Sequence, residues 1–277
     1  MLNKLHPIFL ILFLAIAFFL GDLYYNKLEL ALERVSPGAI VLRKITSPSS
    51  NVLGVQSTPR DLHQIVMLGD SMTERLGNST ELQQYLKTYY PDKRFLILNY
   101  GYGSTNILSA SERLEKETFH AGRAFQPILN IDFDTILIES FGNNPLSDYP
   151  LNQGLQIQNQ ALDKIVSQIK TSHPQARIVF VSTIAPNKAN FAKSSVDLSP
   201  EKRAQWVAER DAYMENHINY AKAHRIPFID IYSKSKTLSG DGDMEYIDSQ
   251  DYIHPSPKGI YFISEEIATF FYQNKYF

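Results

Sequence analysis

Short apolar runs alternate with longer segments of helical periodicity along the chain from residue 61 onward. Five of these runs predict buried strands, at residues 65–68, 95–98, 135–138, 178–181 and 228–231. Strands separated by helices imply right-handed crossovers and a parallel sheet that is covered on both faces. The pattern therefore predicts an α/β fold, a three-layer α/β/α sandwich around five parallel strands.

Two of the predicted helices have clear signals. Between the third and fourth strands, a helix that ends before Pro174 carries apolar residues on one face, namely Leu155, Leu162, Ile165, Val166 and Ile169. Before the fifth strand, Ser199-Pro200-Glu201 combines a capping serine with a first-turn proline. This second helix is predicted to continue to about Arg225.

The N-terminus carries an unbroken apolar run from Ile8 to Leu20, preceded by Lys4. The run is short for a membrane span and suits a secretory signal, whereas Leu5 to Tyr25 could cross a bilayer as a helix. The small-x-small cleavage candidate, Ala15-Ile16-Ala17, lies inside the apolar run. We therefore favour residues 1–25 as a membrane anchor, with Lys4 cytoplasmic and the remaining chain extracytoplasmic. Secretion after signal cleavage is the alternative.

Composition adds limits on the rest of the chain. Residues 26–60 predict a short helical stem and a loose linker, which leaves residues 61–277 as the folded domain. A chain of 277 residues with 44% hydrophobic residues can bury a substantial core. The net charge of -2 gives no reason to expect nucleic acid as a partner. The absence of cysteine excludes disulfides, thiolate metal sites and a cysteine nucleophile.

The first predicted strand ends in Gly69-Asp70-Ser71, which places a hydroxyl at the carboxyl end of a strand, just before a helix. Open α/β sheets bind their ligands at this edge. Alone, the motif is also typical of a turn in which Ser71 or Asp70 caps the next helix. Ser71 becomes a candidate nucleophile only if the chain supplies a base for it.

Polar turns also follow the second and third strands. Residues 99–105 form a glycine-rich turn whose free N–H groups could point at an anionic oxygen. After the third strand, the side-chain amide of Asn144 can donate to a developing oxyanion. A tight turn explains the glycines equally well, and an asparagine before Pro145 is also an ordinary turn residue.

Asp251 and His254 are three residues apart, just before a helix that starts with proline. This spacing can place the carboxylate against one imidazole nitrogen while the other nitrogen faces a serine. Asp251 would then fix the tautomer and stabilise the imidazolium. The remaining histidines have no comparable neighbours and are interpreted as surface or helix-capping residues: His6, His63, His120, His173, His217 and His224.

These four segments together resemble the SGNH hydrolase superfamily, also called GDSL esterases and lipases, over roughly residues 61–277. The matching blocks, in chain order, are Gly69-Asp70-Ser71, residues 99–105, Gly142-Asn143-Asn144 and Asp251-x-x-His254. The resemblance implies a flavodoxin-like sheet and hydrolysis of acyl esters without a metal or an organic cofactor.

The resemblance also implies roles for individual residues. Ser71 is the nucleophile, and its backbone N–H donates to the oxyanion. His254 is the base, Asp251 is its orienting partner, and Asn144 is the side-chain oxyanion donor.

Two positions depart from the family pattern. The family usually has a donor glycine five residues after the asparagine of the second block, where this chain has Ser104. We place this oxyanion donor at Gly103, one residue earlier, with Ser104 as the alternative; either residue has an N–H. In the third block Pro145 stands where the family often has aspartate, which could alter the loop beside Asn144 without removing its amide.

We expect a serine hydrolase of acyl esters, with a small-molecule or a glycan ester as substrate and small acyl groups favoured. A cell-envelope polysaccharide O-acyltransferase would use the same residues with a sugar hydroxyl in place of water, and stays open. A non-catalytic binding module tethered at the membrane would lack the nucleophile, the base or the oxyanion donor, and all of these are present.

Overall fold

The computed structural model describes residues 62–277. The predicted membrane anchor at residues 1–25 and the predicted stem at residues 26–60 lie outside the described residues. Within residues 62–277, no helix combines the length and the apolar character needed to cross a bilayer.

Five parallel strands form the central sheet in the order β2-β1-β5-β6-β7. They are β1 (Leu62–Gly69), β2 (Arg94–Gly101), β5 (Thr135–Glu139), β6 (Arg177–Val181) and β7 (Phe228–Ile229). Numbered along the chain, these strands have the 2-1-3-4-5 order of flavodoxin-like sheets. The predicted parallel sheet is confirmed.

The fifth strand is shorter than predicted. It ends at Ile229 because Asp230 caps a short helix, α7 (Ile231–Lys234), by accepting a hydrogen bond from the Ser233 amide at 2.9 Å. An aspartate side chain competes in this way with strand pairing.

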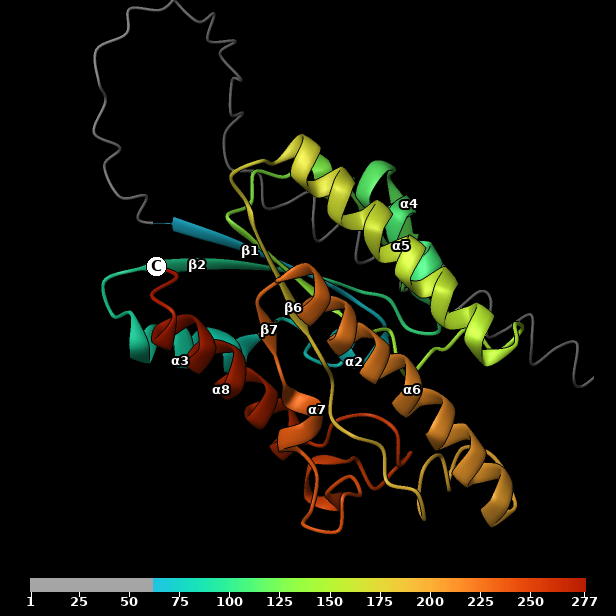
Figure 1. The fold of residues 1–277 in the computed structure, drawn as a ribbon. Coiled ribbons are helices and arrows are strands. Elements are labelled where there is room, and N and C mark those ends of the chain that lie inside the picture. Colours follow the sequence, from blue (N-terminus) through green and yellow to red (C-terminus); the bar gives the residue numbers. More distant parts are fainter. Residues whose placement is uncertain (1–61) are drawn as a thin grey trace, which may run out of the picture. The chain divides into compact units, whose positions relative to one another are not determined.

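Helices cover both faces of the sheet, as Figure 1 shows. Because alternate residues of a strand face opposite sides, β1 contributes to two cores. Val66 and Leu68 belong to the core under α4 (Ala110–Glu115), α5 (Leu151–Ser172) and α6 (Pro200–His224). Ile65 and Met67 belong to the core under α3 (Thr80–Tyr89) and α8 (Pro257–Gln273). The three-layer architecture follows from this alternation.

The two helices with clear sequence signals are confirmed as α5 and α6. The Ser199 hydroxyl caps α6 by accepting from the Lys202 amide at 3.2 Å. At the other end Arg225 adopts a left-handed conformation with φ of 55° and terminates the helix.

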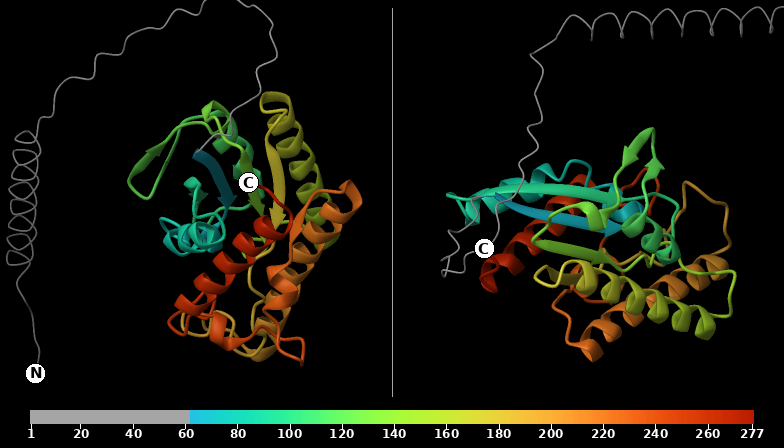
Figure 2. Two further views of the ribbon diagram at one scale, coloured as in Figure 1. Left: turned by 90° about the vertical axis from the view of Figure 1, so that its left-hand side faces the viewer. Right: turned by 90° about the horizontal axis from the view of Figure 1, so that it is seen from above.

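An antiparallel hairpin was not predicted from the sequence. It consists of β3 (Thr118–His120) and β4 (Arg123–Phe125), and it projects from the body of the domain (Figure 2). The remaining short elements are α2 (Ser71–Glu74) and three 3₁₀ turns at Ile107–Ser109, Ile128–Asn130 and Met244–Tyr246.

His217 of α6 is part of the core, so its interpretation as a surface or capping residue is wrong. Its side chain is fully buried, and its ring stacks on Phe180 with the centroids 4.4 Å apart. Burial lowers the pKa of His217 to about 3. The buried ring is therefore neutral over the physiological range.

We expect acid to destabilise the fold through His217. The unfolded chain binds a proton here near pH 6.5, whereas the folded chain does so only near pH 3, so stability is lost as the pH falls between these values. The loss is about 2 kcal/mol at about pH 5. Urea denaturation at neutral pH and at about pH 5 should show that wild type loses about 2 kcal/mol more than His217→Leu. Equal losses in both proteins contradict this expectation.

Candidate active site

The four blocks meet at the carboxyl edge of the sheet. Because β1 lies between β2 and β5, the turns that follow these three strands are neighbours. A pocket of about 570 Å³ opens there. Its walls include five predicted site residues, namely Ser71, Gly103, Ser104, Asn144 and His254. The structure thus brings together residues that are up to 183 positions apart in the chain.

Ser71 is held at the first position of α2. Asp70 caps this helix by accepting a hydrogen bond from the Met72 amide at 2.8 Å. Gly69 serves close packing rather than a left-handed turn: a Cβ at this position would lie 2.0 Å from the Thr73 hydroxyl oxygen. The tight strand-to-helix turn that presents Ser71 therefore requires glycine at position 69.

A hydrogen-bonded chain connects Ser71, His254 and Asp251. His254 Nε2 lies 2.9 Å from Ser71 Oγ, and His254 Nδ1 lies 2.7 Å from Asp251 Oδ2. A carboxylate only accepts hydrogen bonds, so the proton of a neutral His254 is on Nδ1. Nε2 is then free to accept the proton of Ser71. This is the arrangement of a nucleophile with its base.

Asp251 is fixed as an ionised acceptor. Its Oδ1 accepts from the amides of Ile253 at 2.8 Å and His254 at 3.0 Å, and its Oδ2 accepts from Arg75 Nη2 at 3.1 Å. Burial raises the pKa of Asp251, but the hydrogen bonds from His254 and Ile253 outweigh burial and lower it overall. Arg75 was not identified from the sequence, because it approaches from the end of α2.

The side chain of Asn144 is oriented by Asp70. Its amide nitrogen donates to Asp70 Oδ2 at 2.9 Å. A side-chain amide has two N–H groups, so one remains for a substrate oxygen in the pocket. Asp70 therefore has two functions, since it caps the helix of Ser71 and positions Asn144.

Glu139, the last residue of β5, holds Asp70 through a hydrogen bond to its backbone amide. The sequence analysis gave Glu139 no role. Its Oε2 accepts from the Asp70 amide at 2.9 Å, and its Oε1 accepts from the Ser140 hydroxyl and the Phe141 amide, both at 2.8 Å. Burial raises the pKa of Asp70. Burial and the charge of Asp70 raise the pKa of Glu139 well above its usual range.

The second block has an unexpected neighbour. The Gly103 amide nitrogen lies 3.3 Å from His120 Nε2, and this ring nitrogen also lies 2.9 Å from Glu74 Oε1. His120 is partly exposed, and the β3–β4 hairpin brings it into contact with the second block, which the sequence did not predict. Ser104, with φ of 59°, is the adjacent residue in the same pocket. The choice between the two oxyanion donors stays a prediction.

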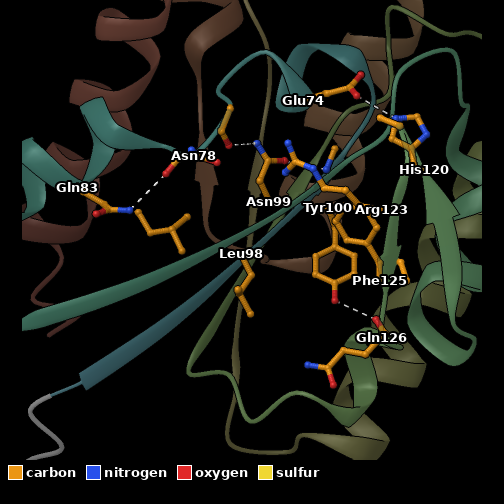
Figure 3. A pocket seen from close by; sticks show the side chains of 15 residues that line it. Glu74, Asn78, Gln83, Leu98, Asn99, Tyr100, His120, Arg123, Phe125 and Gln126 are labelled. Carbon is orange, nitrogen blue, oxygen red and sulfur yellow. Dashed lines mark hydrogen bonds and ion pairs between the residues drawn. The ribbon is translucent and has the colours of Figure 1, made fainter. Parts of the chain in front are cut away.

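A second pocket of about 600 Å³ lies along β2 beside the hairpin (Figure 3). Asn99, Tyr100, Arg123 and Phe125 contribute to its walls. Glu74 lines this pocket as well as the one that contains Ser71, and the figure shows its contact with His120. The two hollows are thus adjacent at Glu74.

Comparisons with known proteins identify the family of this chain. Residues 67–260 match the GDSL-like Lipase/Acylhydrolase family, which covers more than half of the chain. No curated protein matches the sequence.

Solved structures share the fold at low sequence identity. One is described as a lipolytic protein of the G-D-S-L family from Desulfitobacterium hafniense DCB-2; it is 16% identical, with a TM-score of 0.51, over 75% of this chain and 98% of that chain. Another is a GDSL-like lipase from Bacteroides thetaiotaomicron VPI-5482; it is 13% identical, with a TM-score of 0.51, over 78% of this chain and 90% of that chain. The match over residues 67–260 places the chain in the GDSL-like lipase/acylhydrolase family of the SGNH hydrolase superfamily, a family of hydrolases that act on esters.

Proposed function

We propose that the protein is a serine hydrolase that cleaves esters of small acyl groups, carbohydrate-borne esters included, through an acyl-enzyme intermediate. The observation that carries this proposal is the continuous hydrogen-bonded chain from Ser71 through His254 to Asp251, with distances of 2.9 Å and 2.7 Å. Ser71 and His254 line the same pocket at the carboxyl edge of the sheet.

Acylation begins when His254 Nε2 takes the proton of Ser71 and the serine oxygen attacks the ester carbonyl carbon. The negative charge that develops on the carbonyl oxygen is stabilised by the Ser71 amide, by the free N–H of Asn144 and by the turn at Gly103 and Ser104. Asp251 stabilises the imidazolium. His254 then gives its proton to the alcohol oxygen as the carbon–oxygen bond breaks.

Deacylation repeats these steps with water. His254 takes a proton from water, the hydroxide attacks the acyl carbon, and the acid leaves as Ser71 regains its proton. Both halves of the reaction use one base and one set of oxyanion donors.

The test is ester hydrolysis by the purified full chain. We expect it to release p-nitrophenol and free acid in equal amounts from p-nitrophenyl acetate or butyrate, with Ser71→Ala as the blank. Equal rates in wild type, Ser71→Ala and His254→Ala overturn the proposal. Product analysis distinguishes the polysaccharide acyltransferase. If the acyl group is transferred to an added glycan and less free acid is released, the protein is an acyltransferase and not a hydrolase.

Asn144→Ala should lower kcat by about 10²- to 10³-fold with little change in KM, the usual effect of removing one oxyanion donor. A lost donor that acts only in the transition state does not weaken substrate binding. Steady-state kinetics with p-nitrophenyl butyrate measures this effect. Asn152→Ala, on an exposed turn of α5, is the matched control. A kcat within threefold of wild type would remove Asn144 from the oxyanion site.

A further inference from the structure

Arg210 of α6 is a cation in the catalytic pocket that has no use in the proposed reaction. It lines the same pocket as Ser71 and His254. Its Nη1 donates to the Trp206 carbonyl at 3.0 Å, and its buried Nε has no hydrogen-bond partner among the described residues. Within residues 62–277 it forms no ion pair with a carboxylate.

Two aromatic rings hold this guanidinium in place. The Arg210 Cζ lies 4.8 Å from the ring centroid of Phe191 and 5.1 Å from that of Trp206. Both rings line the pocket. Stacking of this kind fixes a guanidinium plane without neutralising its charge.

A second unpaired donor lies in the same wall. Asn143 is only 7% exposed, and its amide nitrogen has no hydrogen-bond partner within the described part of the chain. Gly142 lets α6 approach this turn, because a Cβ there would lie 2.5 Å from Met214 Cγ and 3.5 Å from the Arg210 carbonyl oxygen. Close packing at Gly142 thus brings the Arg210 turn of α6 against the third block. A buried donor without a partner costs free energy that an acceptor on a ligand recovers.

The other charged residues that line this pocket are already paired. Arg75 binds Asp251, and Glu74 contacts His120. Burial lowers the pKa of Arg210, and the negative charges of Glu209 and Asp70 partly offset this by raising it. Arg210 is therefore the cation of this wall that is available for a ligand.

We propose that Arg210, which lines this pocket together with Asn143, binds an anionic oxygen group of the substrate, a carboxylate or a phosphate, so that the enzyme prefers esters that carry a negative charge. The identity of this ligand as a substrate rests on the proposed function. Binding of the anion can be measured independently of hydrolysis.

Trp206 makes the measurement direct. It is the only tryptophan of the chain, and it stacks against Arg210. The full chain with Ser71→Ala, which does not turn esters over, would be titrated with paired ligands while tryptophan fluorescence is recorded. The acyl-side pair is monomethyl adipate and its terminal amide. The alcohol-side pairs are 4-acetoxybutanoate with its amide and 3-acetoxypropyl phosphate with 3-acetoxypropanol.

We expect at least one charged ligand to bind about tenfold or more tightly than its neutral partner, the usual effect of a charge-assisted hydrogen bond. The pair that shows the preference identifies carboxylate or phosphate. Adding Arg210→Gln should abolish the preference, Arg210→Lys should restore part of it, and Arg94→Gln, an exposed arginine at the opposite end of β2, should leave it intact.

Equal affinity within every pair overturns the proposal, as does a preference that survives Arg210→Gln. If Arg210→Gln does not fold, the test uses the Ser71→Ala protein and its Arg210→Lys variant. The affinities of charged and neutral ligands in these two proteins then test the proposal. Failure of the proposed hydrolase would instead appear as lack of turnover by wild type, with the binding preference unaffected.

Discussion

Ser71→Ala is expected to lower kcat/KM for p-nitrophenyl butyrate by roughly 10³- to 10⁶-fold, since it removes the atom that forms the acyl-enzyme. His254→Ala should cost a similar amount, because a serine hydroxyl without a base is a weak nucleophile. The double variant should be no worse than either single variant, since the two residues act as one unit. Initial rates with an uncatalysed blank measure all three.

The matched control is Ser239→Ala, which removes an exposed hydroxyl in a surface loop. It should retain wild-type kcat/KM. If Ser71→Ala and Ser239→Ala have the same rates, Ser71 is not the nucleophile.

Asp251→Asn is expected to lower kcat by about 10³- to 10⁴-fold. An asparagine amide would present N–H groups to His254 Nδ1 and to Arg75, which now both donate to Asp251 Oδ2. The imidazole would then carry its proton on Nε2, the nitrogen that faces Ser71. A protonated Nε2 cannot accept the proton of the Ser71 hydroxyl. Steady-state kinetics near neutral pH measures the loss.

Asp248→Asn controls for the change of carboxylate to amide. Asp248 Oδ1 accepts from the Gln250 amide at 2.9 Å, and an asparagine oxygen can do the same. We expect wild-type activity in this variant. A loss of less than tenfold in Asp251→Asn would show that Asp251 does not set the tautomer of His254.

Much of this arrangement could be predicted from the sequence because its signals are local. Parallel strands that are buried on both faces appear as short apolar runs. The three-residue spacing of Asp251 and His254 lets one loop form their contact. The position of Ser71 at a strand end follows from the apolar run before it.

The missed features depend on contacts between distant residues. Glu139 contacts the Asp70 amide across 69 positions, and Arg75 contacts Asp251 across 176. His120 reaches Gly103 only because a hairpin of three-residue strands folds back toward the sheet. Strands this short carry no clear alternation of apolar and polar residues.

Arg210 shows the same limit. The sequence predicts the helix that carries it, but the depth of this helix in the structure depends on close packing at Gly142. A charged residue in a helix is ordinarily assigned to a solvated face. Its place in the pocket that contains Ser71 becomes visible only when α6 meets the turn after β5.

The central claim is that His254 activates Ser71 in the folded protein, and covalent labelling tests it most directly. A fluorophosphonate probe should modify the full chain once, on the peptide that contains Ser71, as read by mass spectrometry after digestion. Ser71→Ala should take up no label, and His254→Ala should react far more slowly. Labelling of a serine other than Ser71 would contradict the account. A folded wild-type protein that takes up no label would contradict it as well.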